Sequence, residues 1–110
     1  MERTLPILIP KDQLTGFCQH HHIRKLSLFG SVLRDDFTDH SDVDFLVKFE
    51  LGKPPGYLRL SSMENQLSDL IGRKVDLRTT NELSRYFRQE VIDLAMVQYV
   101  ALVPLHGNNL

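Results

Sequence analysis

The apolar positions along the chain repeat at helical spacing in three segments. The first predicts a short amphipathic helix over residues 11–21. The second predicts a core-facing helix over residues 57–71, which Gly72 ends. The third predicts a last helix that is capped by Thr80 or Asn81. Its apolar stripe consists of Leu83, Tyr86, Phe87, Val91 and Leu94.

Alternation of apolar and polar residues predicts strands over residues 25–29, 42–49 and 74–78. In the second strand one face carries Val43, Phe45, Val47 and Phe49, and the other carries Asp42, Asp44, Leu46 and Lys48. The apolar stretch over residues 96–105 is expected to pair along an edge of the sheet, with packing against a partner chain as the alternative. The order of these elements predicts an α/β fold with a small mixed sheet, one side of which is covered by helices.

The chain of 110 residues has the length of one domain, so we expect a single domain over residues 1–110. Its apolar runs are far shorter than the ~20 residues of a membrane span, and the apolar patch Leu5 to Pro10 lacks a secretory cleavage site. A single cysteine, Cys18, excludes an intrachain disulfide and is typical of a reducing compartment. We therefore expect a cytoplasmic protein without membrane association.

The charges nearly cancel, but they are unevenly placed. Thirteen basic and fourteen acidic residues give a formal net charge of −1, which argues against direct nucleic-acid binding. Five of the acidic residues lie within residues 35–44, and five basic ones lie within residues 73–88. Each cluster is either a solvated surface or part of a site. The basic cluster, which would contact nucleotide phosphates or an acidic partner, consists of Arg73, Lys74, Arg78, Arg85 and Arg88.

Asp42 and Asp44 stand two apart on the second predicted strand, so their side chains share a face with Cβ atoms about 7 Å apart. Two carboxylates this close favour a divalent cation, and hard oxygen ligands select Mg²⁺ or Mn²⁺. Mg²⁺ takes one or two carboxylates together with phosphate oxygens, which points to a nucleoside triphosphate. With Asp76 on another strand, the set could hold two ions. The histidines of residues 20–22 point about 100° apart on a helix and do not predict a metal site.

Gly30-Ser31 stands where the first predicted strand ends. Backbone N–H groups and the Ser31 hydroxyl can converge there on phosphate oxygens, because glycine has no Cβ to obstruct their approach. Ser31 can alternatively cap the turn over residues 32–34. Arg34 either adds a contact to phosphate or forms an exposed ion pair with Asp35 or Asp36.

These residues together carry a family resemblance. Gly30-Ser31, ten intervening residues and Asp42-Val43-Asp44 resemble the G-S-x10-D-x-D pattern of the minimal nucleotidyltransferases (MNT proteins) of the polymerase-beta superfamily. The resemblance extends through Asp76 to most of the chain. It implies the minimal nucleotidyltransferase fold, an α/β fold with a mixed sheet of three to four strands.

The resemblance also implies the roles of the site residues. Asp42, Asp44 and Asp76 would be the catalytic and metal-binding carboxylates for two Mg²⁺ ions, with Asp76 helping to activate the acceptor hydroxyl. Gly30, Ser31 and Arg34, together with Asp42 and Asp44, would bind ATP as the substrate.

The family resemblance implies an acceptor as well. Stand-alone MNT proteins resemble antitoxins that are paired with HEPN ribonuclease toxins, to which they transfer AMP on a tyrosine. We therefore expect a protein adenylyltransferase in a hetero-oligomer with a cognate HEPN toxin.

Two alternatives stay open, namely a non-catalytic antitoxin that acts by binding and nucleotidyl transfer to RNA. The first draws support from Leu33 and Asp35, which stand where the family usually has Ala and Gly.

Overall fold

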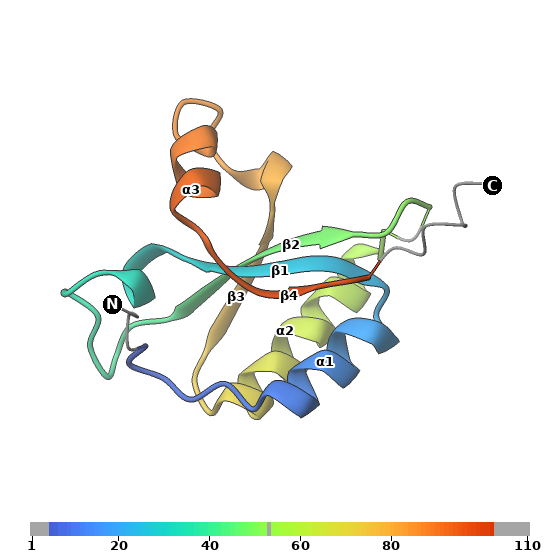
Figure 1. Ribbon diagram of the computed structural model, residues 1–110, viewed down its shortest axis with the longest axis horizontal. Coiled ribbons are helices and arrows are strands. Elements are labelled where there is room, and N and C mark those ends of the chain that lie inside the picture. Colours follow the sequence, from blue (N-terminus) through green and yellow to red (C-terminus); the bar gives the residue numbers. More distant parts are fainter. Residues whose placement is uncertain (1–4, 53, 103–110) are drawn as a thin grey trace.

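A four-stranded mixed sheet forms the centre of the molecule in the computed structural model, which describes residues 5–52 and 54–102 (Figure 1). The strands are β1 (Ile23–Phe29), β2 (Val43–Phe49), β3 (Val75–Thr79) and β4 (Met96–Val100). Their order in the sheet is β3-β2-β1-β4. β1 runs antiparallel to both of its neighbours, and β2 pairs with β3 in parallel.

Two helices, α1 (Lys11–His20) and α2 (Tyr57–Ile71), lie on the same side of the sheet (Figure 1). The third helix, α3 (Arg88–Leu94), stands on the opposite side, together with the 3-10 turn η2 (Thr80–Glu82). A second 3-10 turn, η1 (Gly30–Leu33), follows β1 directly. The predicted α/β fold with a mixed sheet is confirmed, and α1 and α2 cover one side of it as expected. The last helix was expected on that side too, but α3 lies on the other side.

The core fills the space between the sheet and the pair α1 and α2. On β2 the predicted apolar face is confirmed, because Val43, Phe45 and Val47 are buried, whereas Asp44 and Leu46 on the other face are half-buried. The buried core residues are Leu14, Phe17, Cys18, Ile23, Leu26, Leu28, Val32, Val43, Phe45, Val47, Met63, Leu67, Val75 and Leu77. Burial of this one face leaves the acidic face of β2 accessible to ligands.

Helix α2 has the predicted bounds, and Gly72 ends it with φ 80°, a left-handed conformation that glycine adopts without strain. The last helix was predicted too long. Only residues 88–94 are α-helical, since Thr79 and Glu82 form a capping box that starts the short turn η2 instead. Tyr86 and Phe87, expected on its buried stripe, are 81% and 60% exposed.

Smaller differences concern the first strand and its turn. β1 begins two residues earlier than predicted, at Ile23, which is fully buried. Ser31 lies inside η1 and makes no capping hydrogen bond, so that alternative is wrong. The predicted edge pairing of residues 96–105 is confirmed for β4, and residues 103–105 lie outside the described residues.

Side chains close the outer edge of β3. The backbone N–H groups of Val75 and Leu77 donate to Ser68 Oγ at 3.0 Å and to Glu64 Oε2 at 2.8 Å, both on α2. The N–H of Thr79 donates to Glu82 Oε1 at 2.7 Å. The outward amides of this edge strand are therefore satisfied within the chain.

Within the described ranges, none of the helices is long and apolar enough to cross a membrane.

Candidate active site

Asp44 lies at the centre of the predicted acidic site. In the sheet it is paired with Phe29 of β1 on one side and with Asp76 of β3 on the other. Directly paired residues of neighbouring strands share a face, so the Asp44 and Asp76 carboxylates stand side by side. Asp42 precedes β2 by one residue, and its negative charge also acts on Asp44. The structure thus places Asp76 directly beside Asp44 in the sheet and Asp42 close enough for its charge to act on Asp44.

The pKa of Asp44 reflects its burial and the negative charges near it. Burial raises its pKa to about 6, and the negative charges of Asp76 and Asp42 add to the rise. Arg78 and Arg34 act in the opposite direction without cancelling it. At neutral pH the carboxylate is therefore ionised at a cost, which a bound cation would offset.

Gly30 brings the backbone against this carboxylate. Its φ of 78° is in the left-handed region, and a Cβ at this position would lie 2.6 Å from Asp44 Oδ2. Only glycine meets both the backbone conformation and the close approach. Ser31 follows within η1 and is half-buried. The Gly-Ser turn and the carboxylates predicted to act together are therefore neighbours in space.

The donor set fits Mg²⁺ bound jointly by protein and nucleotide. Among the described residues no group of three or more His, Cys, Asp or Glu side chains is arranged so that it could hold a metal ion. Mg²⁺ does not need such a cage, since it commonly takes one or two carboxylates, phosphate oxygens and water. The uncompensated charge around Asp44 is the observation that supports a cation here.

The basic side chains near the site have varied contacts. Arg34 Nε donates to Asp36 Oδ1 at 3.3 Å on the surface, so the ion-pair alternative is confirmed, while a phosphate contact stays a prediction. Lys74 Nζ lies 3.9 Å from Asp42 Oδ2. Of the basic cluster, Arg85 stacks over the Tyr86 ring and Arg88 donates to the Leu83 carbonyl. The members of the cluster therefore have separate partners in the chain, and a contact with phosphates or an acidic partner stays a prediction.

A pocket of about 430 Å³ opens beside the Gly-Ser turn. Phe29, Gly30, Leu33 and Arg34 line it from the end of β1, and Glu90, Val91 and Leu94 line it from α3. The sequence did not single out these α3 residues for the site, because no local pattern indicates that α3 folds back over the end of β1. Asp35 is exposed and does not line this pocket.

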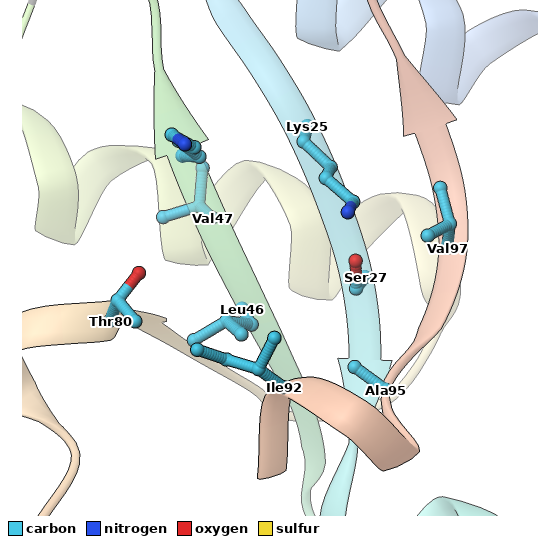
Figure 2. Close-up of a pocket in the computed structure, with 9 residues that line it drawn as sticks. Lys25, Ser27, Leu46, Val47, Thr80, Ile92, Ala95 and Val97 are labelled. Carbon is cyan, nitrogen blue, oxygen red and sulfur yellow. The ribbon is translucent and has the colours of Figure 1, made fainter. Parts of the chain in front are cut away.

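A second pocket, of about 210 Å³, lies between α3 and the open face of the sheet (Figure 2). Figure 2 shows Ile92 of α3 and Leu46 of β2 at this pocket, with Lys25 and Ser27 of β1 further along. None of the predicted site residues lines it. The pocket beside Gly30 contains the predicted nucleotide-binding residues Gly30 and Arg34, whereas Asp76 lines a different pocket of about 240 Å³.

A family model describing the nucleotidyltransferase domain matches residues 11–100. The chain belongs to this family. Its match to the nucleotidyltransferase domain covers every strand of the sheet and all three predicted carboxylates.

Two relatives of this nucleotidyltransferase domain come from Thermococcus cleftensis and Methanocaldococcus jannaschii. Protein adenylyltransferase MntA of Thermococcus cleftensis is 34% identical over 70 residues, which cover 64% of this chain and 69% of that protein. A Methanocaldococcus jannaschii protein, named as a protein adenylyltransferase, is 41% identical over 59 residues. That match covers 54% of this chain and 58% of the relative, so it spans less than two thirds of the relative's length.

Solved structures share the fold of the domain. A structure described as a minimal nucleotidyltransferase has a TM-score of 0.63 at 27% identity, covering 86% of this chain and 88% of that chain. A chain from the complex of a tri-AMPylated Shewanella oneidensis HEPN toxin with an MNT antitoxin has a TM-score of 0.60 at 15% identity. That match covers 83% of this chain and 70% of the other. The predicted minimal nucleotidyltransferase fold is confirmed.

Proposed function

We propose that this chain transfers AMP from ATP to a tyrosine hydroxyl of a cognate HEPN ribonuclease toxin and thereby neutralises it. The observation that carries the proposal is the pairing of Asp44 with Asp76 across β2 and β3, directly beside the positive-φ Gly30. Two findings support it: the relatives are named protein adenylyltransferases, and the Shewanella oneidensis complex contains an AMPylated HEPN toxin. The proposal places the protein in the cytoplasm, where ATP is available.

The residues of this chain divide the reaction between them. The backbone at Gly30 and Ser31 would hold the triphosphate, and Arg34 would contact it on leaving Asp36. Asp42, Asp44 and Asp76 would hold two Mg²⁺ ions, which when bound supply positive charge to the attacking and leaving oxygens.

The proposed reaction is a single displacement at the α-phosphorus of ATP. The acceptor oxygen forms a bond to the α-phosphorus of ATP, and the bond from that phosphorus to the β-phosphate oxygen breaks. Pyrophosphate leaves with the bonding electron pair. Asp76, which lies beside Asp44, would take the proton of the acceptor hydroxyl.

The test uses the purified chain and the partner encoded by a neighbouring reading frame. The two are mixed with ATP and Mg²⁺, and the partner is weighed by intact mass spectrometry. We expect a mass gain of one or more AMP units that Asp44→Asn abolishes. Asp39→Asn, an exposed change in the same acidic stretch, should leave the gain intact.

Other results would select the alternatives. Neutralisation that survives both Asp44→Asn and the removal of ATP would overturn the enzymatic proposal in favour of binding alone. A parallel incubation of tRNA with each nucleotide reports tailing directly, and transfer to tRNA instead of protein would replace the proposed acceptor.

A further inference from the structure

We infer that Arg73 is a positioning residue for Asp42: its guanidinium fixes the peptide that precedes this carboxylate and so presets one side of the metal site. The inference rests on the proposed function, and it assigns to Arg73 a role other than contact with phosphate. Arg73 follows directly after the left-handed Gly72 that ends α2, and it precedes β3. Its position is thus set by two elements of the core.

The guanidinium of Arg73 closes the loop that leads into Asp42. Its Nη2 donates to the carbonyl oxygens of Thr38 and Ser41, at 2.7 Å each. Its Cζ lies 4.7 Å from the centre of the Phe37 ring, within range of a cation–π interaction. One side chain therefore contacts both ends of the turn over residues 38–41, together with the residue before it.

The turn itself is ordered by short-range hydrogen bonds. The Thr38 N–H donates to Ser41 Oγ at 2.9 Å, and the Ser41 N–H donates to the Thr38 carbonyl at 3.1 Å. These bonds fix the shape of the turn but not its place relative to the sheet. Arg73, 32 residues away from Ser41 in the sequence, supplies that placement.

Asp42 needs such support more than Asp44 does. Asp44 lies inside β2 and is paired with a strand on each side, whereas Asp42 lies just before the first residue of β2. The Val43 N–H donates to the Lys74 carbonyl at 2.8 Å, which fixes the chain after Asp42. Arg73 holds the Ser41 carbonyl, and thus the peptide bond before Asp42. The two contacts together leave the Asp42 backbone little freedom.

The first readout is amide hydrogen exchange of residues 38–43 in the full chain without metal or nucleotide. Arg73→Gln should raise exchange there on the order of tenfold, as expected for losing hydrogen bonds to a charged donor. Arg73→Lys, which keeps the charge but not the planar group over Phe37, should give an intermediate rise. The matched control is Arg24→Gln, an exposed change on β1 near the end of β2 that is remote from Asp42.

The second readout is the Mg²⁺ concentration that gives half-maximal transfer of AMP to the partner. Arg73→Gln should raise this concentration by about tenfold, within the range for residues that orient metal ligands. Activity at saturating Mg²⁺ should fall much less, and Arg73→Lys should recover part of the Mg²⁺ response. A purely structural role would instead reduce activity at every Mg²⁺ concentration.

The two proposals fail in different ways. If wild-type chain transfers no AMP, the proposed function fails, and the exchange experiment alone decides whether Arg73 holds the loop. If exchange of residues 38–43 in Arg73→Gln equals that of Arg24→Gln, the inference is overturned. It is also overturned if the loop loosens while the Mg²⁺ response of an active enzyme stays unchanged.

Discussion

Gly30 and the Asp44 carboxylate approach each other so closely that the backbone and the site constrain one another. We predict that Gly30→Ala costs about 1 kcal/mol or more of unfolding free energy, because alanine is strained at positive φ. It should also abolish AMP transfer, since the new Cβ would lie 2.6 Å from Asp44 Oδ2. Urea denaturation and the mass assay measure the two effects.

Gly52 provides the matched control for this prediction. Its φ is 76°, and a Cβ added there would meet no atom within 4 Å. Gly52→Ala should therefore lose a similar amount of stability through backbone strain alone and keep full AMP transfer. Equal activity of the two variants would show that the Gly30 backbone does not shape the carboxylate site.

Single residues differ in how far the sequence could predict their roles. The shared face of Asp42 and Asp44 follows from alternation along one strand, and so it was predictable. The contacts of Arg73 depend on a loop more than thirty residues away, which no local pattern encodes. The same holds for Lys74, whose ammonium lies near Asp42.

At the level of elements, His21 joins α1 to α2. Its Nε2 lies 2.9 Å from Gln66 Oε1, while its buried Nδ1 has no hydrogen-bond partner in the part of the chain that the structure describes. Burial lowers the pKa of His21, with His20, Arg59 and His22 adding positive charge nearby and the Gln66 hydrogen bond acting in the opposite direction. The unfolded chain therefore takes up this proton at a higher pH than the folded one does.

The sign of the pH dependence follows from this difference. We predict that His21 makes the urea midpoint fall as pH decreases from 7.5 to 5.5, because protonation below the ordinary histidine pKa favours the unfolded chain. Asp44, whose pKa is raised to about 6, acts in the opposite direction over the same range. His21→Gln should reduce that fall. His20→Gln, an exposed change on the same helix, should retain it. Identical pH responses of both variants would assign the fall to other groups.

Helices also show where pattern alone misleads. Helix α2 matched its prediction because its apolar residues pack against β3 and the rest of the sheet. The stripe from Leu83 to Leu94 has the same period, but residues 80–87 form turns and only residues 88–94 continue as α3. Periodicity indicates a helix only when a surface is available for its apolar face, and that surface is set by tertiary structure.

For the whole molecule, the site lies on the side of the sheet that α1 and α2 leave open. We predict that AMP-PNP with Mg²⁺, at about 100 times its dissociation constant, raises the melting temperature by about 10 °C. Each component alone should raise it less, because the cation would bind oxygens from both protein and nucleotide. Differential scanning fluorimetry measures the shift.

Two variants show whether the carboxylate site causes this stabilisation. Asp44→Asn should remove most of the shift, and without ligand it should melt higher than wild type at pH 7.5, because a crowded negative charge is gone. Asp39→Asn should behave like wild type. A full shift in Asp44→Asn would place the nucleotide elsewhere on the molecule.

The closed edge of β3 limits how copies of this protein can join through their sheets. A strand added at this edge would need the outward amides of Val75, Leu77 and Thr79. These amides already donate to side chains of the same chain, namely Ser68, Glu64 and Glu82. The other edge of the sheet is β4. Two copies joined along β4 would present a β3 strand at both ends of the combined sheet. No further copy could add a strand at either end of the combined sheet. Edge-to-edge association would therefore stop at a dimer and would not continue into a filament.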